Sequence, residues 1–138
     1  MKKILLALLP CLFSCSILLG QQKEYKIVFD FTKADTASFA TMMRQARNIL
    51  NATVDAKLEI VCHGPGLDML ITKKTTVQKE IEELQRKSNV VFAACEATMK
   101  RTGVDKTQLL PLIVTVPLAN LEIASKQQDG WSYVKAGY

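Results

Sequence analysis

The chain of 138 residues lacks several patterns that mark common functional classes. It has no Cys-x-x-Cys motif, which argues against a thioredoxin-type redox centre. Its only histidine is His63, and only Cys62 and Cys95 lie outside the N-terminal segment, so we expect no metal site. Lysines and arginines are scattered among acids without an aromatic-rich basic patch, so the sequence gives little support to nucleic-acid binding.

The sequence also lacks an apolar run long enough for an ordinary membrane span. The apolar stretch over residues 4–19 is short for that purpose and has no cationic stop-transfer flank. Lys2 and Lys3 precede this stretch, and polar residues follow Gly20. This pattern is typical of a cleaved signal peptide, so we expect a signal over residues 1–20 and export, to the periplasm in a bacterium.

A lipoprotein signal is the alternative interpretation of the N-terminus. Residues 12–15 read Leu-Phe-Ser-Cys and loosely resemble the lipobox of bacterial lipoproteins, in which Cys15 would carry the lipid. Phe13 fits that box poorly, and an apolar run would follow the lipidated cysteine. We therefore favour the cleaved signal and a mature domain over residues 21–138.

Strand-like and helix-like patterns alternate along this domain, and no repeat, low-complexity tract or linker interrupts them. We expect strands over residues 25–31, 57–62, 89–94, 110–116 and 131–136. We expect helices from about residue 36, over 75–87, from 96 to about 102, and over 118–128. This alternation predicts a single-domain α/β fold with a mostly parallel five-stranded sheet and helices on both faces.

Residues with useful chemistry stand at the carboxyl ends of three expected strands. Asp30 lies near the end of the first strand, His63-Gly64-Pro65-Gly66 follows the second, and Cys95 follows the third. Carboxyl ends of parallel strands share one edge of the sheet and line the ligand crevice. We therefore expect a site there, with Cys95 as the reactive sulfur, His63 as a proton carrier, and Asp30, Gly64 and Gly66 as binding residues.

The sequence leaves three roles open for Cys95. It stands between a strand and a short helix that Gly103 closes, and a helix N-terminus favours thiolate over thiol, although the adjacent Glu96 would raise the thiol pKa. A packed core residue is the second role, since free cysteine is among the most buried residue types. A disulfide with Cys62 is the third, provided that their two strands are neighbours.

Several segments together carry a family resemblance. They are residues 58–68 (LEIVCHGPGLD), 91–98 (VFAACEAT), 116–117 (VP) and 128–135 (QDGWSYVK), with Asn48 after Gln45-Ala-Arg. In combination they resemble the DsrE/DsrF-like family, and in particular its small, often exported YchN-like branch.

This resemblance implies a five-stranded α/β sandwich that assembles as a homo-oligomer, either a trimer or a hexamer. It also implies sulfur relay as a cysteine persulfide, with Cys95 in the position of the sulfur-carrying cysteine and the His63-Gly64 loop close to it. We expect no cofactor. The leading hypothesis is an exported protein that binds or relays a small sulfur species on Cys95. The alternative is a non-catalytic oligomeric binding or assembly module in which Cys95 is structural.

Overall fold

The computed structural model describes residues 23–137, so the predicted signal and the lipobox-like segment lie outside the described residues. Five strands form one sheet in the order β4-β3-β2-β1-β5, and every neighbouring pair is parallel. The strands are β1 (Lys26–Phe31), β2 (Lys57–Cys62), β3 (Val90–Cys95), β4 (Val114–Val116) and β5 (Ser132–Ala136). The predicted α/β fold class is confirmed.

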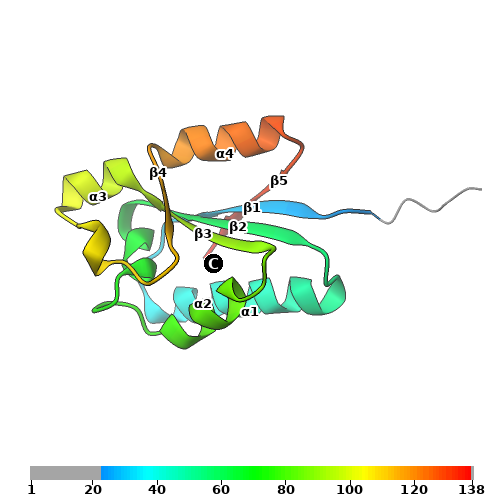
Figure 1. The fold of residues 1–138 in the computed structure, drawn as a ribbon, viewed down its shortest axis with the longest axis horizontal. Helices are drawn as coiled ribbons and strands as arrows, with labels where there is room; N and C mark the ends of the chain where they lie inside the picture. Colours follow the sequence, from blue (N-terminus) through cyan, green and yellow to red (C-terminus); the bar gives the residue numbers. More distant parts are fainter. Residues whose placement is uncertain (1–22, 138) are drawn as a thin grey trace, which may run out of the picture.

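Helices cover both faces of the sheet (Figure 1). Of the described helices, α1 (Thr36–Ala52) and α2 (Gln78–Gln85) lie on one face, and α4 (Ala119–Gln128) lies on the other. The carboxyl edge of the sheet carries α3 (Glu96–Thr102) and two 3-10 helices, η1 (Gly64–Leu70) and η2 (Lys106–Gln108). Within residues 23–137, no helix is long and apolar enough to cross a membrane.

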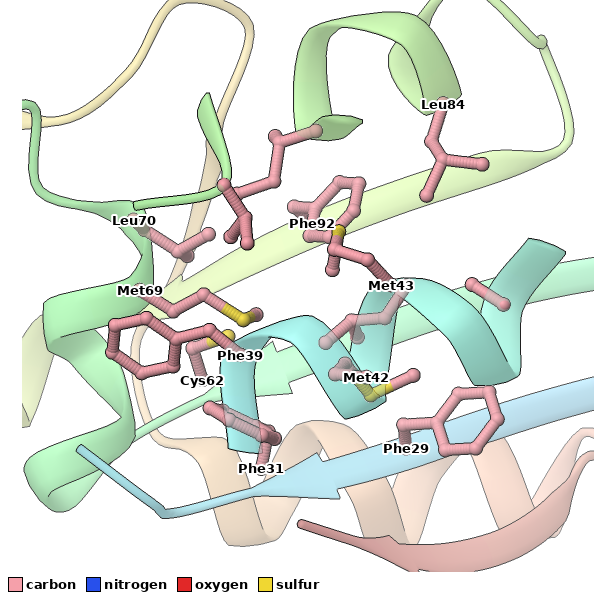
Figure 2. Packing of buried hydrophobic residues seen from close by; sticks show 14 of the residues in the cluster. Phe29, Phe31, Phe39, Met42, Met43, Cys62, Met69, Leu70, Leu84 and Phe92 are labelled. Carbon is pink, nitrogen blue, oxygen red and sulfur yellow. The ribbon is translucent and has the colours of Figure 1, made fainter. Parts of the chain in front are cut away.

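The larger apolar layer lies between the sheet and helices α1 and α2 (Figure 2). It contains the buried rings of Phe29, Phe31, Phe39 and Phe92, together with Met42 and Met43 of α1. Burying a phenylalanine or methionine side chain contributes about 1.5–3 kcal/mol. This layer therefore supplies most of the apolar burial that holds the fold together.

The smaller apolar layer lies between the sheet and α4. Its buried members are Val28, Val61, Ala93, Cys95, Val116, Ala119 and Ile123. Cys62 belongs to the opposite layer, so the two cysteine side chains point to different faces of the sheet although β2 and β3 are neighbours. Both are free thiols, and a disulfide between them is therefore ruled out as an interpretation of this fold.

Two predicted elements are shorter in the structure. The strand expected over residues 110–116 is confined to Val114–Val116, because Pro111 and Leu112 form a turn in which Leu112 has a φ of 61°. The helix expected over residues 75–87 begins at Gln78, because the Thr75 hydroxyl accepts a hydrogen bond from the Val77 N–H outside the helix. Both changes leave the strand order and the carboxyl edge intact.

Candidate functional site

The expected site residues share one face of the sheet at its carboxyl edge. Asp30, His63 and Cys95 each stand two residues after a member of the apolar layer beneath α4, namely Val28, Val61 and Ala93. Side chains two residues apart on extended chain share a face, and His63 is extended at φ −147°. The register of β2 on β3, continued by one residue, sets His63 opposite Cys95. These three residues therefore form a row across neighbouring strands.

Asp30 is the centre of a polar network in this row. Its Oδ1 accepts a hydrogen bond from His63 Nε2 at 2.8 Å, and its Oδ2 accepts from Lys135 Nζ at 2.9 Å and from the Tyr133 hydroxyl at 3.0 Å. Burial raises the pKa of Asp30, but these donors outweigh burial and hold that pKa below its ordinary value. The ionised carboxylate therefore fixes the His63 ring with Nε2 as the donor.

Lys135 and Tyr133 are site residues that sequence reasoning missed. Lys135 is the register partner of Asp30 on β5, and it also donates to the Thr32 hydroxyl at 3.1 Å. Their approach to Asp30 depends on β5 lying beside β1, which follows from the crossing of α4 over the sheet. The available signal was that Lys135 follows Tyr133 by two residues, so both had to share one face.

The sulfur of Cys95 is enclosed by hydrogen-bond donors. The Ala119 N–H donates to Sγ at 3.4 Å, and the Thr98 hydroxyl also hydrogen-bonds to the sulfur. Burial raises the pKa of Cys95, but the Thr98 hydroxyl and the N–H groups of Ala119 and Thr98 outweigh burial, so the pKa lies below its ordinary value. The residue is only 2% exposed. Cys95 thus combines donors that favour its thiolate form with a cover, the start of α4, that keeps its sulfur from solvent.

Cys62 is the opposite kind of cysteine. It is fully buried among apolar side chains beneath α1, and burial together with the negative charge of Asp30 raises the pKa of its thiol strongly. A thiol in such surroundings is inert. Cys62 therefore provides an internal reference for the reactivity of Cys95.

Thr98 connects the sulfur to the loop after β2, and sequence reasoning missed it too. Its Oγ1 accepts a hydrogen bond from the Gly64 N–H at 3.1 Å, which leaves the hydroxyl proton to donate to Cys95. Gly66, in contrast, packs directly against the backbone of Phe31 and Thr32. The spacing of three residues from Cys95, the N-cap of α3, to Thr98 was the available signal.

Two groups other than Cys95 interact with the negative charge of Glu96. Its carboxylate accepts a hydrogen bond from the Thr115 hydroxyl at 2.6 Å and lies 3.5 Å from Lys106 Nζ. The Thr115 hydrogen bond is the main reason that the pKa of Glu96 lies below its ordinary value. Glu96 was expected to raise the pKa of the Cys95 thiol. The donors around the sulfur outweigh that effect, because the pKa of Cys95 lies below its ordinary value.

Replacing Thr98 by valine is expected to raise the pKa of Cys95 and to slow its alkylation at neutral pH several-fold. Valine keeps the volume of threonine but removes the hydroxyl that favours the thiolate. The measurement is the rate of iodoacetamide labelling against pH, read on the Cys95 peptide by mass spectrometry. Thr98→Ser keeps the hydroxyl and should retain the pH midpoint, and equal midpoints for valine and threonine would contradict the assignment.

A hollow of about 460 Å³ lies beside the Asp30 network. It is lined by Lys33, Asp35, Ser38, Lys135, Ala136 and Gly137. It sits where β1 meets β5, the point at which the chain reverses its direction of progress across the sheet and where open α/β sheets bind ligands. Within residues 23–137, no three His, Cys, Asp or Glu side chains gather as metal ligands. The site therefore offers a sulfur, an imidazole and ammonium groups.

Comparisons with known proteins agree with this fold. The model of the DsrE/DsrF-like family matches residues 25–136. A solved protein of unknown function from Methanobacterium thermoautotrophicum is similar at 24% identity and a TM-score of 0.76, over 81% of this chain and 99% of its own. The YchN protein from E. coli is similar at 14% identity and a TM-score of 0.63, over 82% of this chain and 98% of its own. A conserved protein of unknown function from Bacteroides thetaiotaomicron is similar at 19% identity and a TM-score of 0.65, over 80% of this chain and 93% of its own. The search of curated proteins found no match.

Proposed function

The chain belongs to the DsrE/DsrF-like family, which is associated with sulfur relay, and we propose that it binds or relays a small sulfur species as a persulfide on Cys95. One observation carries the proposal: the Thr98 hydroxyl and the Ala119 N–H converge on the Cys95 sulfur. Donors at that position stabilise the thiolate, which is the form that attacks a sulfur donor.

The proposed step needs no oxidant. With thiosulfate, the Cys95 thiolate attacks the outer sulfur, a new S–S bond forms, and sulfite leaves with the electron pair of the S–S bond that breaks. With a polysulfide, the leaving group is the polysulfide shortened by one sulfur atom. Both donors are anions, and the hollow beside the Asp30 network carries the positive side chains of Lys33 and Lys135. In this scheme His63, oriented by Asp30, takes up the proton that the Cys95 thiol loses when the thiolate forms.

Intact-mass analysis tests the persulfide. The purified protein is expected to gain the mass of one sulfur atom after thiosulfate or polysulfide and to lose it after reductant. Cys95→Ser should abolish the gain, whereas the matched variant Cys62→Ser should retain it. No gain in the wild-type protein, or an equal gain in Cys95→Ser, would reject sulfur binding on this residue.

The second candidate function is a non-catalytic binding or assembly module in which Cys95 is structural. The observation that favours it is the enclosure of Cys95, which is 2% exposed. In that case Cys95 should resist sulfur donors and alkylating reagents alike, as Cys62 should. The alkylation measurement separates this candidate from a sulfur carrier.

Export and homo-oligomer formation belong to the same proposal. Export is supported by the signal-like pattern of residues 1–20. Oligomer formation is supported by apolar side chains that stand exposed on β4 and just before it: Leu112 and Val114. N-terminal sequencing of the secreted protein tests signal cleavage, and light scattering in solution tests for a trimer or a hexamer.

A further inference from the structure

Cys95 cannot react with a molecule from solution while its cover is in place. The residue is 2% exposed, and the Ala119 N–H at the first turn of α4 donates directly to its sulfur. The preceding Pro117 carbonyl accepts a hydrogen bond from the Ala97 N–H at 3.2 Å, which fixes the entry to α4 next to the sulfur. A sulfur carrier built in this way requires the start of α4 to move.

The helix that forms this cover has a small apolar contact with the sheet. Only Ala119 and Ile123 of its ten residues are buried, whereas Leu121 is 66% exposed. By comparison, α1 on the opposite face buries six side chains, two of them methionines and one a phenylalanine. In addition, β4, which leads into α4, is a three-residue edge strand. Elements with few buried apolar contacts are the ones that open locally.

An ion pair compensates for this weak apolar contact. Lys126 Nζ, in the last turn of α4, lies 2.5 Å from Oε2 of Glu59, which stands in β2 and is only 3% exposed. The same ammonium lies 3.6 Å from Glu122 and 4.7 Å from the centre of the Trp131 ring. Burial raises the pKa of Glu59, as expected for a carboxylate that depends on one partner. If Lys126 leaves, a buried charge loses that partner.

We propose that α4 is a lid over Cys95, that the Lys126–Glu59 ion pair holds it closed, and that lifting the whole helix from the sheet exposes the sulfur. This inference rests on the proposed function for its purpose, since a lid is useful only over a reactive group. Its mechanism rests on the contacts of α4 alone. Opening breaks the Ala119 hydrogen bond to Cys95 but leaves the Thr98 hydroxyl of α3 beside the sulfur, and it leaves the apolar layer beneath α1 and α2 in place.

The test compares the two cysteines within one protein. Iodoacetamide labelling of the purified protein at pH 8, mapped by peptide mass spectrometry, gives separate rates for Cys95 and Cys62. Local opening of α4 exposes Cys95 only, so we expect Cys95 to label at least about tenfold faster than Cys62. Equal, slow labelling of both residues would overturn the lid, because it would mean that Cys95 is exposed only by global unfolding.

Substitutions of the ion pair give the sharper result. Lys126→Met leaves Glu59 buried without its partner. The pair is broken both when the lid opens and when the protein unfolds, so labelling of both cysteines should speed up about tenfold, with Cys95 still the faster and the ratio of the two rates kept. The double variant Glu59→Met with Lys126→Met replaces the pair by apolar groups and should return both rates to the wild-type values or below. No increase in the single variant, or no reversal in the double variant, would overturn the role of the pair.

One control separates lid opening from general loss of stability. Leu84→Ala removes packing on α2 that lid opening leaves intact, so it should speed Cys62 labelling more than Cys95 labelling and lower the ratio of the two rates, which Lys126→Met should keep. The readout also stands apart from the proposed function, because iodoacetamide is not a sulfur donor. Fast Cys95 labelling without sulfur gain would retain the lid and reject the persulfide. Sulfur gain with no response of Cys95 labelling to Lys126→Met would support the persulfide and reject the lid.

Discussion

Replacing Gly66 by alanine is expected to destabilise the protein by about 3 kcal/mol and to disturb the site at the same time. A Cβ at this position would stand far inside contact distance of the Phe31 carbonyl oxygen and 2.8 Å from the Thr32 Cα. These are backbone atoms at the end of β1, so no side chain can turn away to make room. Urea unfolding followed by circular dichroism measures the loss.

The same substitution should also loosen the His63–Asp30 contact. Gly66 N–H donates to the His63 carbonyl at 3.0 Å, and His63 N–H donates to the Phe31 carbonyl at 3.1 Å. A shift that relieves the clash therefore moves both ends of the hydrogen bond from His63 to Asp30. The chemical shifts of the His63 ring should change in Gly66→Ala even under conditions in which the variant remains folded.

Gly103→Ala is the matched control. Gly103 closes α3 at a φ of 69° with open space around the position of a Cβ, so alanine meets backbone strain there without a clash. That strain costs about 1–2 kcal/mol. A Gly66→Ala variant as stable as Gly103→Ala would show that the end of β1 and η1 are not in close contact.

The sheet could be predicted because apolar runs of five or six residues alternate with helical patterns. The bounds of β2 agree with the prediction, and α3 ends at Gly103 as expected from glycine at a helix C-terminus. Caps were less predictable, because tertiary contacts replaced them. At the start of α4 the N-cap is Leu118, whose side chain makes no cap hydrogen bond. The Pro117 turn, held by Ala97, fixes that end instead.

Only one feature of the site could be predicted, namely that residues at the carboxyl ends of parallel strands share one edge of the sheet. This feature placed Asp30, His63 and Cys95 on one edge, and the structure brings Asp30 and His63 into direct contact. The partners of these residues depend on strand order and register, which alternation along the chain does not specify. Lys135 reaches Asp30 because β5 pairs with β1.

Buried charge was the hardest feature to predict. Glu59 sits inside the apolar run of β2, where its neighbours give no sign of a partner. That partner, Lys126, follows 67 positions later in the chain, on the helix that crosses the whole sheet. Cys62 and Cys95 illustrate the same limit, since the register that separates them onto opposite faces became visible only in the structure.

Asp30 is expected to make the stability of the protein depend on acid pH. Its folded-state pKa is lowered, chiefly because donation from Lys135 and His63 outweighs the effect of burial. The stabilisation is therefore present above the unfolded-state pKa of about 3.9 and is lost as the pH falls through the lower folded-state value. Unfolding by urea between pH 7 and pH 2 should show this loss in the wild-type protein.

Asp30→Asn isolates this contribution. At pH 7 the variant should be less stable by about 1–2 kcal/mol, because an amide N–H₂ cannot accept the hydrogen bonds of Lys135 or Tyr133. We place the value at the low end for charged hydrogen bonds, since the Lys135 side chain is 42% exposed and solvent screens its charge. The difference between variant and wild type should begin to shrink below about pH 4, where Asp30 takes up a proton in the unfolded wild-type chain, and should be lost once the pH passes the lower folded-state pKa. A difference that stays constant down to pH 2 would assign the effect to packing rather than to the charge of Asp30, whereas one that disappears would identify Asp30 as the anion that anchors His63.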